Sequence, residues 1–533
     1  MSDEHGRDHR ESGDAQRFDR RTALAGAAGA LAAGVLLRDP ALARAASQGL
    51  GGRAAKGGVL RVGLVGNGPN EVLDPQNQQN VIDTATDRVL FDTLARQRAD
   101  GTIEPRLALT FEPNKTADVW TVTLRPGVVW HDGKPLTAAD VAYSYRRIIE
   151  KKLAGAGILS FIDPKRTRIL DKHTVRFFCA QPNVFFDQAA SSSVATIIQN
   201  GAGAKPFTTK NLVGSGPFKL GSIVPGQKSV FLKNPHYFDH GKPHVDQLQF
   251  IIIPDSTARL NALLAGQVDV IEQLNATQAQ TIKAHSGFAV LNSPSGHWVP
   301  MCMDVTKAPF NDVRVRQALR LIPDRPQMVA NALSGFGKIG NDLFGFDDPL
   351  YDSALPQRHQ DLEQAKSLLK AAGQDNLTVD LQTADAATGM LASALIFAEN
   401  AKGAGVTVNV VKNPADSFYS QQYMKTPFFY SEWADRPLVP QFGLCLTAGA
   451  PYNETQYHVP GFDALVKQAQ KTLNPAKRKD LLFAAQKMLY DSGGYIIWGF
   501  VNFLDGYNAK VKGLHTNPGR SLGFYNFNDV TIA

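Results

Sequence analysis

The sequence predicts an α/β protein with more than one lobe. Strand-sized apolar runs alternate with amphipathic helical segments over most of the chain, a rhythm that favours α/β lobes over a helical bundle or a β-sandwich. The 533 residues are too many for one ordinary domain. A composition of 43% hydrophobic and 20% charged residues is that of a globular protein.

The first 45 residues have the features of an export signal. Arg20-Arg21 precede an apolar run over residues 23–37, and Ala43-Arg44-Ala45 follows as a small-x-small cleavage site. The run is shorter than the roughly 20 residues needed to span a bilayer. We expect a twin-arginine signal peptide over 1–45, cleaved after Ala45, and a soluble mature protein in the periplasm. An uncleaved membrane anchor or a plain amphipathic leader is the alternative, and the lack of a cysteine near the cleavage site excludes a lipid anchor on a mature N-terminal cysteine.

The first half of the chain contains clear local signals. Residues 59–65 are predicted to form the first strand, which ends in the glycine-containing turn 66–69. Residues 120–130 have the pattern of a β-hairpin that turns at Pro126-Gly127. Thr137 and Asp140 have the spacing of a capping box, so a helix is predicted to begin there.

Strands and helices continue to alternate farther along. The predicted strands are at residues 250–253, 268–271, 377–381, 406–411 and 495–501. The predicted helices are at residues 257–264, 362–372 and 390–401. Gly266 and Gly373 end two of these helices, because glycine readily takes the left-handed conformation of a helix C-terminus.

Charge and cysteine content narrow the class of protein. The net charge of +7 is spread over the sequence, whereas nucleic-acid binders concentrate basic residues, so no nucleic-acid partner is expected. Three cysteines leave at least one free thiol. We favour buried free thiols, and a Cys302–Cys445 disulfide is the alternative. No zinc-type spacing occurs. We therefore expect no metal site and no cofactor.

Recognised catalytic motifs are missing from the sequence. It has no GxSxG elbow, no HExxH, no Walker loop and no dinucleotide fingerprint. His131-Asp132 could form an acid/base pair, but Asp-Gly after a strand is ordinary turn chemistry. An exported protein with several α/β lobes and no catalytic motif is most often a ligand receptor, with its site in the cleft between lobes. We expect no enzymatic activity.

Several segments resemble one known family. They are Leu73-Asp74-Pro75, Glu104-Pro105-Arg106-Leu107-Ala108, residues 120–141 (WTVTLRPGVVWHDGKPLTAADV), residues 214–218 (GSGPF), residues 233–238 (KNPHYF) and residues 309–318 (PFNDVRVRQA). From about Gly58 onward the chain thus resembles the solute-binding receptors of ABC importers, in the peptide, opine and nickel class called family 5. Phe238 stands where the family usually has tryptophan.

The resemblance implies a periplasmic-binding-protein-like type II fold, with two main lobes, an extra inserted domain and a hinge cleft. The implied domain I comprises residues 46–85, 212–297 and 492–533, domain II residues 86–211, and domain III residues 298–491. The implied partners are a small solute and an inner-membrane ABC permease, and we expect a monomer. The aromatic and glycine residues of the diagnostic motifs are structural in this interpretation.

The segment from Phe428 to Pro437 is the main candidate for ligand contact, because it reads as a strand running into a polar loop. Peptide-binding relatives have an aspartate here that pairs with the ligand's α-amino group, and Asp435 matches it by position. Arg436 would engage a carboxylate, and Trp433 would stack on the ligand or line its cavity. In relatives with a Trp-x-Gly-Arg-Pro loop, Asp435 would stand at the glycine, and a surface Asp–Arg pair beside a core tryptophan is the alternative.

Three further residues are weaker candidates for ligand contact. Tyr452 and Asn453 lie in a second polar loop, and Asn67 lies in the turn after the first strand. The expected function is that of a periplasmic receptor for a peptide or peptide-like solute. Alternatives are an opine, sugar derivative, nickel chelate or haem as cargo, an exported hydrolase, and a chaperone-like or sensory binding protein.

Overall fold

The computed structural model describes residues 57–66 and 71–533, which belong to one unit that begins at Ala54. The predicted signal peptide and Asn67 lie outside the described residues. Within the described ranges, no helix is both long enough and apolar enough to cross a membrane.

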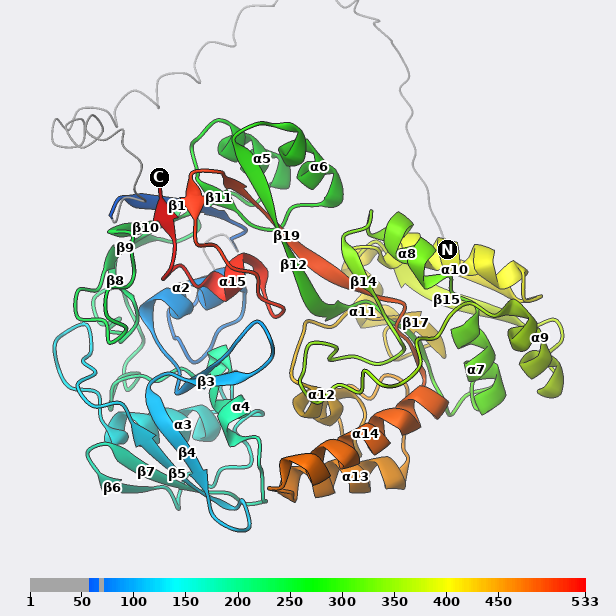
Figure 1. Cartoon of the computed structure of the whole chain (residues 1–533), viewed down its shortest axis with the longest axis horizontal. Helices are drawn as coiled ribbons and strands as arrows, with labels where there is room; N and C mark the ends of the chain where they lie inside the picture. Colours follow the sequence, from blue (N-terminus) through cyan, green and yellow to red (C-terminus); the bar gives the residue numbers. More distant parts are fainter. Residues whose placement is uncertain (1–56, 67–70) are drawn as a thin grey trace, which may run out of the picture. The chain divides into compact units, whose positions relative to one another are not determined.

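The first lobe is built on an eight-stranded sheet (Figure 1). Its strands run in the order β12-β19-β11-β1-β10-β9-β8, and β14 also pairs with β19. Their bounds are β1 Val59–Leu64, β8 Phe218–Val224, β9 Lys228–Lys233, β10 Gln247–Ile252, β11 Val270–Ile271, β12 Phe288–Trp298, β14 Gly337–Ile339 and β19 Gly499–Asn508. The predicted first strand is confirmed as β1, which lies parallel to both β10 and β11.

Four helices and a small ladder complete this lobe. They are α2 (Val81–Leu90), α5 (Ser256–Leu264), α6 (Ala276–Ala284), α15 (Ser521–Tyr525), and the pair β20 (Val511–Lys512) with β21 (Thr531–Ile532). Helix α5 matches the predicted helix and ends before Gly266, whose φ is +69°.

The inserted domain has its own four-stranded sheet, in the order β4-β5-β7-β6. Its elements are β4 Ala108–Pro113, β5 Val119–Leu124, β6 Arg168–Asp171, β7 Thr174–Phe178, α3 Ala138–Glu150, α4 Phe186–Ala190 and the 3₁₀ turn η1 Ser193–Ala195; the hairpin β2 Ala95–Gln97 and β3 Ile103–Pro105 precedes them. The Thr137–Asp140 capping box is confirmed at the start of α3.

The predicted hairpin over residues 120–130 is wrong. β5 pairs with β4 and β7, and the segment after Gly127 forms only a bridge between Val129 and Pro135. Gly127 (φ +77°) breaks the strand, and Trp130 is then drawn into the core of the inserted domain. The turn interpretation of His131-Asp132 is confirmed, because Asp132 accepts the backbone N–H of Lys134.

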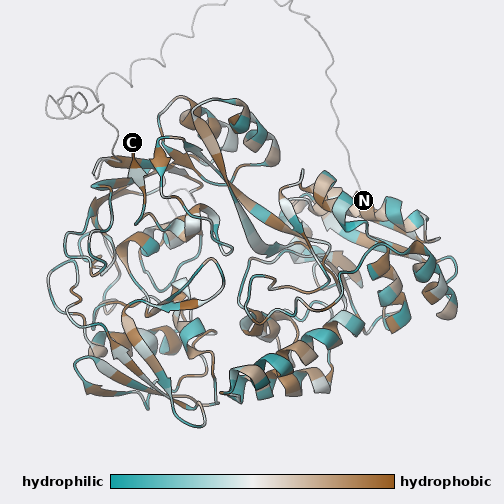
Figure 2. Ribbon diagram, viewed as in Figure 1, coloured by the Kyte–Doolittle hydropathy of each residue, from teal (hydrophilic) through white to brown (hydrophobic). Residues whose placement is uncertain are grey.

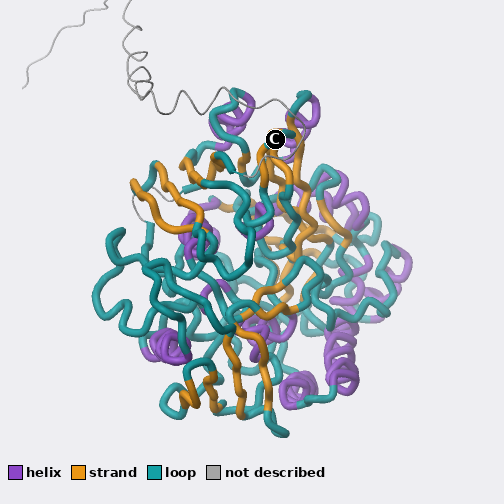
Figure 3. The backbone as a smooth tube through the Cα atoms, turned by 60° about the vertical axis from the view of Figure 1, so that its left-hand side comes forward, coloured by secondary structure: helices purple, strands orange, loops and turns teal. Residues whose placement is uncertain are grey.

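The second lobe has a five-stranded sheet in the order β16-β15-β17-β13-β18, with helices on both faces. Its strands are β13 Met301–Met303, β15 Thr378–Ala384, β16 Thr407–Asn413, β17 Phe428–Tyr430 and β18 Tyr495–Ile496. Its helices are α7 Val313–Leu321, α8 Arg325–Ala332, α9 Leu362–Ala371, α10 Met390–Lys402, α11 Ala415–Gln421, α12 Leu438–Cys445, α13 Pro460–Lys471 and α14 Pro475–Ser492. Figure 3 shows the strands of the sheets in orange and the helices in purple.

Alternate residues of each central strand enter opposite cores. In β17, Phe428 packs toward α7 and α10, whereas Phe429 packs toward α12 to α14. The helices accordingly carry both hydrophobic and hydrophilic stretches (Figure 2).

Two adjacent antiparallel strands carry the chain between the lobes. β12 leaves the first sheet and leads into β13, and β18 leads back into β19 (Figure 1). Where the return strand crosses, Asp342 accepts the N–H of Ile497 at 3.0 Å and Gly340 donates to the carbonyl of Trp498. The loop at residues 340–342 therefore fastens the second lobe to the crossing.

We propose the predicted domain boundaries with two changes, and β14 is a short excursion of the second-lobe segment that pairs with β19 of the first sheet. A boundary between residues 85 and 86 would divide α2, although Ala85 and Val89 lie in the same first-lobe core, so we place it after Phe91. A boundary between residues 491 and 492 would assign β18 to the first lobe, although β18 pairs with β13. We therefore place the return crossing after Ile496.

Candidate functional site

Trp433 lies at the place where the second-lobe loop meets the crossing strand β12. Its backbone pairs with that of Trp298, through N–H···O contacts of 2.9 and 3.1 Å, and the two indole rings stack with centroids 6.2 Å apart. Trp433 is 8% exposed. The pairing fixes the loop from Ala434 to Pro437 against the hinge.

The buried carboxylate of Glu454 holds this indole, a role that sequence reasoning missed. Its Oε2 accepts the indole N–H of Trp433 at 2.9 Å and the hydroxyl of Tyr495 at 2.8 Å, and its Oε1 accepts the hydroxyl of Ser431. Burial raises the pKa of Glu454, and these hydrogen bonds oppose the rise. Glu454 follows the predicted Tyr452-Asn453 pair directly, but no local pattern indicated that it would be buried.

Tyr452 and Asn453 have different surroundings. The Tyr452 ring is 47% exposed and meets Trp433 edge-on, with centroids 5.8 Å apart. Asn453 is 4% exposed, and its amide is used inside the loop: Nδ2 donates to the carbonyl of Tyr457 at 3.1 Å and Oδ1 accepts the N–H of Tyr457 at 3.0 Å. The structure thus gives Asn453 a loop-shaping position, whereas Tyr452 faces outward beside Trp433.

All three cysteines are buried free thiols. The thiol of Cys302 lies 3.7 Å from Oε2 of Glu454, and that of Cys445 contacts the carbonyl of Gln441 at 3.1 Å. Burial raises the pKa of Cys302 well above its ordinary value. The preference for free thiols over a Cys302–Cys445 disulfide is therefore confirmed.

Asp435 is half-buried and is directed toward a second carboxyl, that of Asp347. A methyl group built on Gly296 of β12 would collide with Oδ1 of Asp435 and would lie 2.9 Å from Oδ1 of Asp347, so only glycine fits there. The two carboxyls therefore lie close to each other. Burial and the charge of Asp347 raise the pKa of Asp435 well above its ordinary value.

Two arginines lie beside this acidic pair. The Arg436 guanidinium is 5.4 Å from the centre of the Trp433 ring and donates to the carbonyl of Ala434 at 3.2 Å. Burial and the charge of Arg520 lower the pKa of Arg436. Within the part of the chain that the structure describes, neither Arg436 nor Arg520 forms an ion pair with a carboxylate.

Arg520 comes from the first lobe, and no local sequence pattern indicated it. A Cβ atom built on the adjacent Gly519 would lie 4.0 Å from Oδ2 of Asp435. Residues from both lobes thus meet at one cluster with two carboxyls and two guanidiniums. Such a cluster can bind a ligand that has both an ammonium and a carboxylate group.

Arg520 is followed by α15, whose backbone is an unusual left-handed turn and not an ordinary helix. Leu522, Gly523, Phe524 and Tyr525 have φ values of +53° to +63°. This conformation is costly for side chains with a Cβ, by roughly 1–2 kcal/mol per residue. Two buried carboxyls hold it: Asp505 accepts the N–H of Leu522 at 2.7 Å, and Glu272 accepts the hydroxyl of Tyr525 at 2.8 Å.

These carboxyls should make stability depend on pH. Burial raises the pKa of Glu272 to about 7 and that of Asp505 to about 6. Both carboxyls therefore hold a proton more tightly in the folded than in the unfolded protein. Their contribution to the free energy of unfolding is full below the unfolded pKa values near 4 and is lost as pH rises through 6 to 7. For Glu272 the loss is about 3 kcal/mol.

Glu272→Gln should consequently flatten the fall in unfolding temperature between pH 5 and pH 8, because it cannot ionise. Thermal unfolding monitored by circular dichroism checks this, with the exposed Glu112→Gln as the matched control. Identical pH profiles for wild type and Glu272→Gln would contradict the assignment.

The family model described as bacterial extracellular solute-binding proteins, family 5 (Middle), matches residues 102–455. The chain belongs to family 5. It is 28% identical over 494 residues to the periplasmic oligopeptide-binding protein OppA of Salmonella typhimurium, covering 84% of this chain and 90% of OppA. It is 25% identical over 480 residues to the probable D,D-dipeptide-binding periplasmic protein DdpA of Escherichia coli, with the same coverages.

A solved structure of an ABC transporter substrate-binding protein shares the fold. The substrate-binding protein CtaP of Listeria monocytogenes superposes with a TM-score of 0.80 at 21% identity, covering 90% of this chain and 99% of CtaP. The predicted periplasmic-binding-protein-like type II fold is confirmed. Family 5 is a family of binding proteins.

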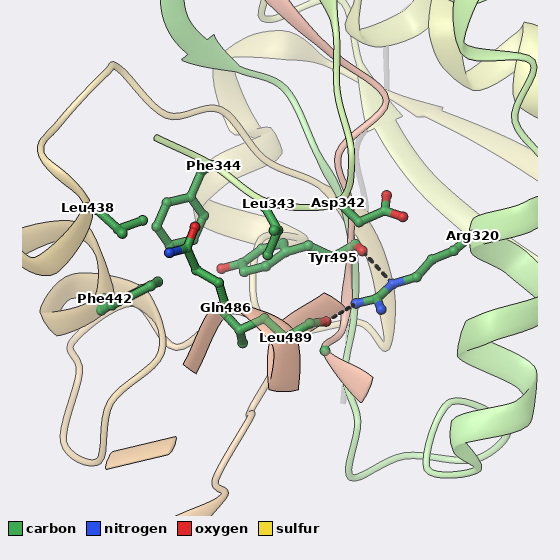
Figure 4. Close-up of a pocket in the computed structure, with 10 residues that line it drawn as sticks. Arg320, Asp342, Leu343, Phe344, Leu438, Phe442, Gln486, Leu489 and Tyr495 are labelled. Carbon is green, nitrogen blue, oxygen red and sulfur yellow. Dashed lines mark hydrogen bonds between the residues drawn. The ribbon is translucent and has the colours of Figure 1, made fainter. Parts of the chain in front are cut away.

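A small cavity lies inside the second lobe (Figure 4). Its wall includes Arg320, Phe344, Phe442 and Tyr495, and Arg320 donates to the carbonyl of Tyr495 at 2.9 Å. None of the predicted ligand residues lines it. Across the described residues, no group of three or more His, Cys, Asp or Glu side chains is arranged to hold a metal ion.

The structure brings together four of the six predicted site residues. Trp433, Asp435 and Arg436 share one loop, and Tyr452 packs against Trp433. Asn453 is directed into its own loop. The prediction from sequence did not include Asp347 and Arg520, which reach the cluster from distant parts of the chain.

Proposed function

We propose that this chain is the substrate-binding receptor of an ABC importer, that it acts in the periplasm after removal of its signal peptide, and that it binds a peptide or peptide-like solute between its lobes. The meeting of Asp435 with Arg436 and Arg520 supports this most directly, since it offers a carboxyl to an ammonium group and guanidiniums to a carboxylate. The ligand would be delivered to a membrane permease, and the receptor would act as a monomer.

Family relatives support a peptide-like cargo. OppA and DdpA are described as binding oligopeptides and D,D-dipeptides, and the DppA protein of Helicobacter pylori was solved with the peptide STSA. An opine is the second candidate, favoured by the two arginines, which would suit a ligand with more than one carboxylate. The AgaA protein of A. tumefaciens, solved with agropinic acid, has the same fold.

Mass spectrometry of small molecules released from the denatured mature protein tests the proposal. A peptide would support the first candidate and an opine the second. A metal chelate, a sugar derivative or haem would overturn both. If the protein is empty, thermal-shift screening of defined peptides and opines replaces the release experiment.

Ligand binding should also close the hinge formed by β12 and β19. A solute favours the closed state only by its extra affinity for it. We expect a saturating ligand to reduce the radius of gyration measured by small-angle X-ray scattering. An unchanged scattering profile at saturation would contradict hinge closure.

A further inference from the structure

The carboxyls of Asp347 and Asp435 lie close together without the hydrogen bonds that would stabilise them in the folded protein. Oδ2 of Asp347 is buried without a hydrogen-bond partner, and among the described residues no N–H or O–H group donates to the carboxyl of Asp435. Buried carboxyls normally have several donors. Two carboxyls placed this close cannot both ionise without a large electrostatic cost.

We propose that Asp347 and Asp435 form a two-carboxyl cradle that holds one proton in the unliganded protein and exchanges it for the ammonium group of the ligand. This inference rests on the proposed function. It adds Asp347 as a second ligand-binding carboxyl and Gly296 as the residue that makes room for the pair. The exchange is balanced: the ammonium enters with its positive charge, and one proton leaves to solvent.

The charges around the cradle are compatible with this exchange. Asp348 adds negative charge from the same loop, but its carboxyl already accepts the N–H groups of Leu350 and Leu438. Lys338 on β14 and Arg436 favour ionisation of the pair. From the inserted domain, Gly101 of the β2–β3 turn lies so close to the carbonyl of Asp347 that a Cβ there would collide with it, while the nearby Arg98 pairs with Glu104.

Arg520 completes the surroundings of the pair from the C-terminal segment. Its charge lowers the pKa of Arg436, so the two guanidiniums are near each other. A ligand ammonium placed between the carboxyls would replace the shared proton, and a ligand carboxylate would find the arginines.

Proton exchange makes the affinity depend on pH. Where the pair is protonated, affinity should rise up to tenfold for each pH unit, because each binding event releases up to one proton. The rise should stop near pH 8, where a peptide α-amino group of pKa about 8 loses its own charge. A lone ionised aspartate would show no rise over this range.

The test uses trialanine as the probe and N-acetyl-trialanine as the probe without an ammonium. Isothermal titration calorimetry at pH 6.5, in phosphate and in imidazole, which differ in ionisation enthalpy, counts the protons released. We expect release of about one proton by the wild type and of none by Asp347→Asn, with no binding of the acetylated peptide. The exposed Asp416→Asn should behave as the wild type does.

Equal proton release by wild type and Asp347→Asn, or a wild-type affinity that is constant from pH 5.5 to 8, would overturn the exchange. A second measurement separates this from failure of the proposed function. Potentiometric titration of the unliganded proteins should show one proton more on the wild type than on Asp347→Asn at pH 6. If trialanine does not bind but that proton is present, the peptide cargo fails and the shared proton stands. Equal proton counts overturn the cradle whatever the cargo.

Discussion

Asp435→Ala is expected to weaken ligand binding by about 100-fold or more. Truncating one partner of a buried, hydrogen-bonded charge pair costs about 2–5 kcal/mol, and each 1.4 kcal/mol is a factor of ten in Kd. The ligand's ammonium would be left among Arg436, Arg520 and apolar groups, with only Asp347 to offset its charge.

Isothermal titration calorimetry with the solute recovered from the purified protein, or with trialanine, measures this effect. Asp416→Asn removes an exposed carboxylate from the same lobe and should leave the Kd unchanged. An Asp435→Ala protein with wild-type affinity and an unchanged unfolding temperature would show that this carboxyl is no ligand anchor.

Asp342→Ala is expected to lower the free energy of unfolding by about 3–5 kcal/mol. The carboxylate is buried and contacts Arg325 at 2.9 Å and Nε of Arg358 at 2.8 Å, and its removal leaves Arg325, which is 1% exposed, with an uncompensated charge. The N–H of Ile497 would lose its acceptor as well. Asp342 also has φ +58°, a conformation that alanine tolerates poorly.

Urea unfolding followed by circular dichroism measures the loss, and Asp342→Asn separates its parts. Asparagine accepts the left-handed backbone but carries no charge, so it should recover only a fraction of the stability. The exposed Asp375→Ala in the same lobe should change stability little. A stability loss at Asp342→Ala no larger than that of this control would contradict the ionic role.

Elements with local signals were predictable from the sequence. The helix expected at residues 390–401 is α10, Met390–Lys402, and the helix expected to end at Gly373 is α9, because caps and glycine conformations act within a few residues. The hairpin at residues 120–130 failed because strand pairing is non-local: β7 lies far along the chain and competes for β5.

Only those residues of the candidate site that lie together in one loop were predictable from the sequence. Trp433, Asp435 and Arg436 are neighbours in sequence, so a strand leading into a polar loop was sufficient to indicate them. Asp347 joins them through tertiary contacts within the second lobe and Arg520 joins them from the first lobe, and no pattern around either residue indicates this. Asn453 was misleading because an asparagine in a polar loop can bind its own backbone as readily as a ligand.

The crossing between the lobes also gives the protein an intrinsic optical reporter. Three of its five tryptophans lie there: Trp298 and Trp433 stack, and the Trp498 indole donates to the carbonyl of Val299 at 2.9 Å. The other two, Trp120 and Trp130, are buried in the core of the inserted domain. A change in tryptophan emission on adding a solute would therefore arise mainly at the hinge, so unlabelled protein is enough to follow both the affinity and the speed of closure in a stopped-flow fluorimeter.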